Sequence, residues 1–264
     1  MLLAAIPFGV AIGVAVGMLG GGGSVLAVPV LVYLLGEDVE TATTISLVVV
    51  TAAAVAGGYG HALKGRVCWR HAAAFTVAAL PGIIAGTALG DAVAGGALIA
   101  GFALVMLLAA AATWRKASAE QPPEDDAQPG HTCPALRPGR DLGAGLVVGF
   151  LTGLFGVGGG FILVPTLAVV LAFSMRSAIG TSLAIITTTS MLGVIVHLAA
   201  GRSLDPGLTL AMGTGCVAGA LLGARLSARV PQQTLSRAFA GLVVAVAGYL
   251  LLSAAFLGGP PTSS

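Results

Sequence analysis

Long apolar stretches separated by short polar loops run through almost the whole chain. Six stretches have the ~20 residues that a membrane-spanning helix needs: Thr41–Gly60, Ala72–Gly90, Ala94–Trp114, Ser177–Ala199, Gly207–Ala224 and Ala238–Leu257. Two longer stretches, Leu2–Leu35 and Leu142–Phe173, are each interrupted by a glycine cluster and then a proline. A membrane β-barrel would instead show ~10-residue stretches of alternating polarity. The pattern therefore predicts an all-α integral membrane protein.

The polar segment Arg115–Arg140 separates two apolar halves. Its centre carries prolines and acidic residues, Gln121–Asp126, which is typical of a flexible linker. We therefore divide the chain into a first transmembrane repeat (1–114), a linker (115–140) and a second transmembrane repeat (141–264). His131 and Cys133 lie in the linker, where we interpret them as incidental rather than metal-binding.

The two halves repeat one another. Gly17–Ser24 followed by Val28–Leu31 matches Gly153–Gly160 followed by Val164–Leu167, at an offset of 136 residues and without a gap. The same register continues through three pairs of polar residues: Ser46 with Ser182, Thr51 with Thr187, and His61 with His197. A register held over such a distance indicates a duplicated unit.

Loop charges indicate that the repeats are inverted. Lysine and arginine favour cytoplasmic loops. In the first half they occur in Lys64–His71 and are missing from Gly36–Glu40, whereas in the second half Arg176 precedes the corresponding helix and only Arg202 follows it. An odd number of crossings per half explains this reversal. Each repeat is then a re-entrant, glycine-broken segment plus three transmembrane helices, with Lys64–His71 and the linker cytoplasmic.

Composition narrows the class of function. Charged residues make up 8% and apolar residues 57% of the chain, against about 25% charged in soluble domains. The net charge of +2 is spread over short loops, so we expect no nucleic-acid partner. The cysteines show no metal-binding spacing, and we interpret Cys216 as core packing. No nucleotide-binding loop and no pair of carboxylates inside spans is found, which argues against an enzyme, a cofactor and a cation transporter.

The paired glycine motifs, together with Ile179–Leu183, resemble the sulfite exporter TauE/SafE family, also called toluene sulfonate uptake permeases. The resemblance covers nearly the whole chain outside the linker and the C-terminal tail. It implies a multi-pass bacterial inner-membrane transporter of sulfite, sulfoacetate or another short sulfonate. The first copy departs from the pattern, because Thr44–Ser46 stands where the second has Gly180–Ser182. The two halves are therefore not expected to contact the substrate equally.

Backbone N–H groups in the glycine segments are the candidate ligands for such an anion. These segments contribute Gly20, Gly21, Gly22, Gly23, Ser24, Gly156, Gly158, Gly159 and Gly160. Hydroxyl groups on the following helices are further candidates: Ser46, Thr51, Thr181, Ser182 and Thr187. The alternatives are that the glycines permit close helix crossing and that the hydroxyls bond carbonyls of their own helix.

His61 and His197 lie in apolar context at repeat-related positions, which suggests proton coupling. The alternative is that each caps a helix C-terminus. Arg66 and Arg202 follow each histidine and are interpreted as residues that extend to the membrane interface.

The sequence thus favours a transporter, in the direction of export, that binds a small sulfur-containing anion between two glycine segments and works by alternating access. The alternative is a passive anion channel or uniporter; a membrane-embedded enzyme is less favoured. The expected partners are the anion and the lipid bilayer, with no cofactor and no metal. A homodimer is one assembly that these patterns allow.

Overall fold

The computed structural model describes residues 2–90, 93, 95–119, 133–155, 160–199, 201 and 204–256. Within these ranges the chain forms helices and short turns, with no β-strand. The expected all-α class is therefore confirmed. Five segments of the described chain are long and apolar enough to cross a membrane: Ala5–Val32, Thr41–Ala62, Trp69–Gly90, Met175–Ala199 and Pro206–Leu226. The protein is accordingly a multi-pass membrane protein.

The first half begins with a helix that is broken at its glycines. These elements are α1 (Leu2–Leu19), the 3₁₀ turn η1 (Gly20–Gly23), α2 (Ser24–Pro29) and the π-helical turn η2 (Val30–Leu34). Three longer helices follow: α3 (Val39–Ala62), α4 (Trp69–Gly90) and α5 (Gly95–Ala119). Pro29 ends α2 without an amide hydrogen to donate, and the chain continues as the wider π turn.

The second half presents its described elements in the same order. They are α6 (Pro138–Phe155), α7 (Gly160–Pro165), the π-helical turn η3 (Thr166–Val170), α8 (Met175–Ala199), α9 (Pro206–Leu226) and α10 (Gln232–Phe256). Here too a proline, Pro165, is followed by a π-helical turn. The helices α1 and α6 have 18 residues each, and α2 and α7 have 6 each.

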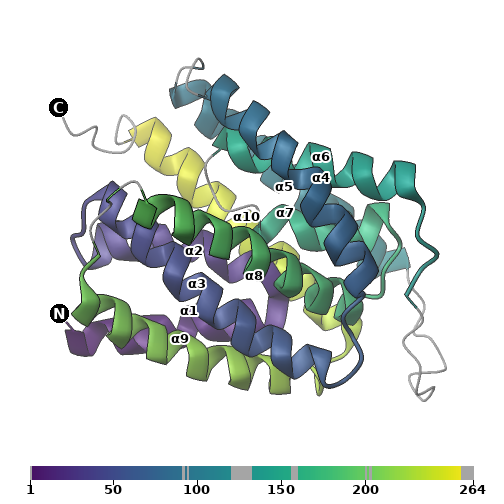
Figure 1. Cartoon of the computed structure of the whole chain (residues 1–264), viewed down its shortest axis with the longest axis horizontal. Helices are drawn as coiled ribbons and strands as arrows, with labels where there is room; N and C mark the ends of the chain where they lie inside the picture. Colours follow the sequence, from purple (N-terminus) through teal and green to yellow (C-terminus); the bar gives the residue numbers. More distant parts are fainter. Residues whose placement is uncertain are drawn as a thin grey trace.

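Glycines bring α1 against α9 at backbone distance (Figure 1). A β-carbon on Gly13 would overlap the carbonyl of Cys216, and one on Gly17 would overlap the carbonyl of Ala220. Contacts step forward along both helices, so α1 and α9 run parallel. Such close approach is how helices associate in lipid, where van der Waals packing replaces the hydrophobic effect.

The pair α4 and α6 is packed in the same way on the other side of the molecule (Figure 1). A β-carbon on Gly149 would overlap the carbonyl of Ala79, and one on Gly153 would overlap the carbonyl of Ile83. These helices also run parallel to one another. The fold thus contains two glycine-packed pairs, α1 with α9 and α4 with α6.

Between these pairs, α3 and α8 cross as antiparallel neighbours. Gly57 of α3 faces Leu183 of α8, while Gly193 near the end of α8 faces Leu47 near the start of α3. The reversed order of these contacts shows that the two helices point in opposite directions. The last helices of each half, α5 and α10, pack against each other.

The helix ends and loops that carry the basic residues lie at one end of the molecule, on the right of Figure 1. There the loop before α4, the end of α5, the start of α6, and the loops before α8 and α10 lie together. Lys116 donates a hydrogen bond to the carbonyl of Phe173 (2.9 Å), and Arg176 donates one to the carbonyl of Val230 (3.3 Å). We call this the cation-rich end. It holds every lysine and arginine except Arg202, which lies outside the described residues.

The charges at this end are close enough to influence one another. Partial burial and the neighbouring guanidinium groups lower the pKa of Lys64. Those groups belong to Arg66, Arg176 and Arg225. The loops that the sequence predicts to be cytoplasmic therefore share one end, and the side of the membrane to which this end belongs stays a prediction.

Candidate functional site

The first glycine segment turns the chain back along α1. Gly20 has φ +75°, a conformation that costs a residue with a side chain more than it costs glycine. A β-carbon on Gly23 would lie 2.7 Å from the carbonyl oxygen of Ile12 and from the amide nitrogen of Val16. Because Gly23 lies beside residues that precede it by two to three turns of helix, α2 does not continue α1 in a straight line.

The turn brings η1 against the start of α7. Gly21 touches the backbone of Gly160, and a β-carbon on Gly160 would lie 2.7 Å from Ser24 Oγ. Ser24 Oγ in turn donates a hydrogen bond to the carbonyl of Gly21 (2.7 Å). We call this contact the glycine junction. The structure thus brings together the described members of both predicted glycine segments; Gly156, Gly158 and Gly159 lie outside the described residues.

The hydroxyl of Ser182 lies at the same junction. A β-carbon on Gly20 would be 2.7 Å from Ser182 Oγ, which donates to the carbonyl of Ile179 (2.8 Å). A β-carbon on Gly22 would lie 3.3 Å from the Phe239 side chain of α10, which is closer than ordinary contact. Ser46, the repeat partner of Ser182, is buried in α3.

The predicted threonines are engaged locally. Thr51 donates to the carbonyl of Leu47 (2.6 Å), and Thr187 donates to that of Leu183 (2.8 Å). Both bonds are of the i−4 type that threonine makes within its own helix, which favours the structural alternative for these two residues. Thr181 differs, because its Oγ1 accepts a hydrogen bond from the Cys68 amide (3.1 Å) and so connects α8 to the loop before α4.

The two repeat-related histidines lie on α3 and α8 in different surroundings. His61 is buried, with Nε2 3.3 Å from the carbonyl of Gly17 and 3.5 Å from Ser227 Oγ. His197 lies on α8 with Nδ1 3.1 Å from Thr44 Oγ1 of α3. Arg66, which was expected to extend to the membrane interface, has its side chain packed into the protein, with only 8% of the residue exposed.

A second polar cluster, at the cation-rich end, was not predicted from the sequence. His71 of α4 and Asp141 of α6 form a buried pair, with Nε2 3.5 Å from Oδ1 and exposures of 3% and 1%. Asp141 Oδ2 also accepts a hydrogen bond from the Arg137 amide (2.9 Å). The ring of Phe173 meets that of His71 edge-on at 5.0 Å.

Asp141 lies in the first turn of α6, at the end of a segment as expected, and it is buried there. Helices α4 and α6 run parallel from the same end, and this brings their first turns together with His71 and Asp141 between them. One signal was available in the sequence: the register of 136 residues places Asp141 opposite the apolar Ala5 of the first half. A charged residue in one repeat at a position that is apolar in the other indicates a difference between the two repeats.

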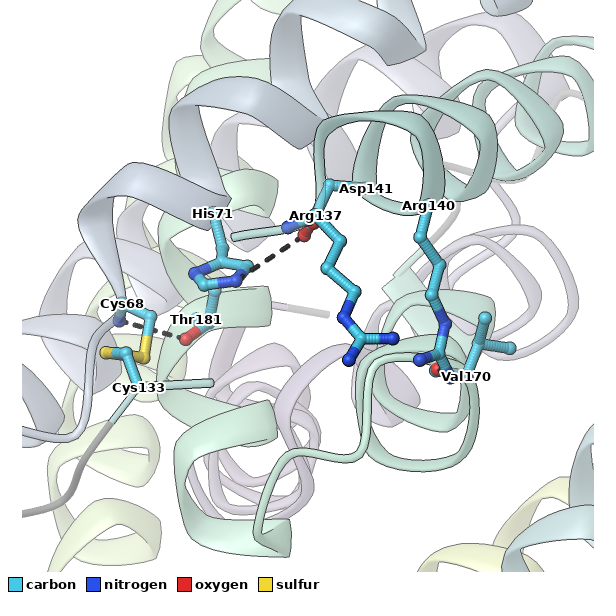
Figure 2. A network of polar contacts seen from close by, with 8 residues as sticks. All are labelled: Cys68, His71, Cys133, Arg137, Arg140, Asp141, Val170 and Thr181. Carbon is cyan, nitrogen blue, oxygen red and sulfur yellow. Dashed lines mark hydrogen bonds and ion pairs between the residues drawn. A yellow bond between two sulfur atoms is a disulfide. The ribbon is translucent and has the colours of Figure 1, made fainter. Parts of the chain in front are cut away.

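A disulfide between Cys68 and Cys133 lies beside this pair (Figure 2). It joins the loop before α4 to the end of the linker, across 65 residues of sequence. No motif in the sequence points to this pairing, and the interpretation of Cys133 as incidental is wrong. Two cavities open next to the disulfide and the His71–Asp141 pair, with volumes of about 190 Å³ and 420 Å³.

The comparison with known families agrees with this architecture. The family described as sulfite exporter TauE/SafE matches residues 5–250. The chain belongs to the TauE/SafE family. The match includes both glycine segments, the linker and the His71–Asp141 pair.

Curated relatives of this TauE/SafE protein are named as transporters. A "Probable membrane transporter protein" of Xylella fastidiosa (strain 9a5c) is 33% identical over 257 residues, which covers 95% of each chain. The "Probable membrane transporter protein YunE" of Bacillus subtilis (strain 168) is 26% identical over 235 residues, covering 83% of this chain and 85% of the relative. No solved structure matches the chain significantly.

Proposed function

We propose that this TauE/SafE protein exports a small sulfur-containing anion, such as sulfite, sulfoacetate or another short sulfonate, across a bacterial inner membrane by alternating access. The substrate binds at the glycine junction. The observation that carries this proposal is the meeting of the two glycine segments, seen in the contact of Gly21 with Gly160. The proposed transport cycle has no enzymatic step, in keeping with the transporter names of the relatives.

The helix directions support two inverted repeats. Helix α1 of the first half corresponds to α6 of the second, and α4 corresponds to α9, so the pair of α1 with α9 is equivalent to the pair of α6 with α4. Helices α3 and α8 also correspond to each other, and they run in opposite directions. The contact of Gly23 with Ile12 supports a re-entrant hairpin that starts and ends on one side. This arrangement is common in secondary transporters, where broken helices meet near the membrane midplane.

The chemistry of the glycine junction suits an anion that must leave water. A lysine or arginine at mid-membrane costs roughly 2.5–3.5 kcal/mol on insertion scales. Among the described residues, the junction uses none and has the glycine backbone of η1 together with the hydroxyls of Ser24 and Ser182, each of which would exchange its carbonyl acceptor for the anion. Glycine allows the backbone to approach the ligand closely. Gly160 lies across the junction from Gly21, and Ser46, the repeat counterpart of Ser182, would complete the site.

The packing at the junction favours alternating access over an open pore. The backbones of Gly21 and Gly160 are in contact, so an anion can pass only after the two segments separate. A transporter of this type saturates with substrate, because one site is loaded and released per cycle. A passive channel would require a continuous opening at this point.

Reconstitution in liposomes tests the proposal. Uptake of sulfite, sulfoacetate, sulfate and chloride would be measured with and without a pH gradient, and we expect saturable flux of sulfite or a short sulfonate. Ser24→Ala should raise the half-saturating concentration about fivefold, the effect of losing roughly 1 kcal/mol of polar contact. Gly22→Ala should raise it as well, because the added methyl group would lie 3.3 Å from the Phe239 ring and shift the backbone of η1. Gly58→Ala is the matched control, because its β-carbon would make only ordinary contact with Leu183.

Flux that rises linearly with concentration would instead assign the protein to the passive channels. Equal affinity in the wild type, Ser24→Ala and Gly22→Ala, with normal folding, would mean that the glycines serve helix contact alone. The site would then lie elsewhere in the molecule.

A further inference from the structure

The cation-rich end contains a cavity whose walls carry the residues that oxyanion sites use. Its volume is about 190 Å³, and it is lined by His71, Pro134, Ala135, Arg137, Arg140, Asp141, Leu171 and Ala172. The neighbouring cavity of about 420 Å³ shares His71, Pro134 and Ala135 with it. Together they form a hollow between the linker end, the start of α4 and the start of α6. We call this hollow the vestibule.

Two guanidinium groups extend from the start of α6 along the vestibule (Figure 2). Arg140 donates a hydrogen bond to the carbonyl of Val170 at the end of η3. The guanidinium of Arg137 has no hydrogen-bond partner among the residues that the structure describes, and Arg137 is exposed. Its planar fork of donors matches the oxygen atoms of a sulfite, sulfonate or sulfate group.

Among the described residues that line the vestibule, Asp141 is the one carboxylate, and it already has partners. Its Oδ2 accepts the Arg137 amide hydrogen, and its Oδ1 lies 3.5 Å from His71 Nε2, so both oxygens face polar groups of the protein. His71 is buried, with 3% of the residue exposed, and its Nδ1 has no hydrogen-bond partner within the described chain. With Nε2 directed at the carboxylate, Nδ1 is the ring nitrogen that remains for a further partner.

A continuous segment, α7 followed by η3, leads from the glycine junction to the vestibule. Gly160, at the start of α7, touches Gly21, and Val170, at the end of η3, accepts the hydrogen bond from Arg140. At 1.5 Å per residue this segment spans about 16 Å. The anion would therefore travel roughly the length of one half-helix between the two places.

We propose that the vestibule is a second anion site, which concentrates the transported oxyanion at the cation-rich end before it reaches the glycine junction. Arg137 is the principal ligand, and Arg140 and His71 complete the site. The inference rests on the proposed function, because it assigns the same substrate class to both places. Clefts lined by one sign of charge raise the local concentration of an opposite ion.

Sided flux measurements in proteoliposomes test this site, with the substrate added at either end of the protein. Arg137→Gln should raise the half-saturating concentration of sulfite roughly tenfold when substrate is added at the cation-rich end. The maximal rate, and the half-saturating concentration from the other end, should stay unchanged. Arg229→Gln is the matched control, since it removes a charge from the same end but outside the vestibule. It should leave both values unchanged.

Direct binding separates failure of this site from failure of the proposed function. Sulfate binding to the detergent-purified protein would be measured by calorimetry for wild type, Arg137→Gln and Arg229→Gln. Weaker binding in Arg137→Gln alone supports the vestibule even if no sulfonate is transported. Equal binding in all three, or equal weakening in both variants, overturns it. Thermal unfolding checks that Arg137→Gln is folded, which we expect because its side chain is exposed.

Discussion

The buried pair of His71 and Asp141 distinguishes the two halves at the level of single residues. At the position equivalent to Asp141, the first half has the buried Ala5. An unpaired carboxylate in such a place would be costly, so the histidine and the Arg137 amide are needed to hold it. One end of the molecule therefore carries a charged cluster that the repeat does not reproduce at its other end.

Proton coupling is tested at His61 and His197, the repeat-related histidines of α3 and α8. If either carries the proton, the double variant His61→Gln/His197→Gln should lose anion accumulation driven by a pH gradient, while counterflow exchange continues. The reason is that glutamine keeps the polar contacts but cannot titrate. The measurement is uptake at several pH gradients in proteoliposomes. Unchanged pH dependence would assign both residues to structure.

At the level of elements, the glycine-packed pairs hold the fold together. Gly13→Ala should destabilise the protein by about 1–3 kcal/mol, because the added methyl group forces α1 away from the Cys216 carbonyl. Gly213→Ala on α9 is the matched control, since nothing lies within 4 Å of its β-carbon. It should change the stability by less than about 0.5 kcal/mol. Thermal unfolding in detergent measures both, and equal stability of the two variants would contradict the packing argument.

Helix ends were harder to predict than helices. The apolar stretches Thr41–Gly60 and Ala94–Trp114 became α3 (Val39–Ala62) and α5 (Gly95–Ala119), which extend into polar residues. An apolar stretch ends where the chain leaves the lipid, whereas the helical hydrogen bonds continue until a capping residue or a helix break. Asp38 supplies such a cap to α3 by accepting the amide hydrogen of Thr41 (2.9 Å).

At the level of the whole molecule, the charge distribution sets the expected orientation. The cation-rich end should face the cytoplasm, and Gly36–Glu40 should face the other side. Single cysteines placed in each loop of a cysteine-free variant would be labelled with an impermeant maleimide in intact cells. We expect labelling at Gly36–Glu40 and none at Ala172–Arg176. Labelling of both from the same side would exclude the inverted arrangement.

The sequence predicted the helical class and the meeting of the glycine segments more readily than the vestibule. The hydropathy of a segment and the 136-residue repeat can both be recognised by comparing residues along the sequence. The pairing of Cys68 with Cys133 and of His71 with Asp141 depends on which loops share an end, which is a property of the folded chain alone. The burial of Arg66 likewise depends on neighbours that are distant in the sequence.

The Cys68–Cys133 disulfide makes the linker dispensable as a covalent connection. Cys68 belongs to the first half and Cys133 precedes the second, so the halves stay joined when the chain is cut between residues 119 and 133. A protease nick there would yield two fragments on a gel only after reduction. In a reducing cytoplasm the bond opens, and the two halves then depend on the linker and on their packing to remain one molecule.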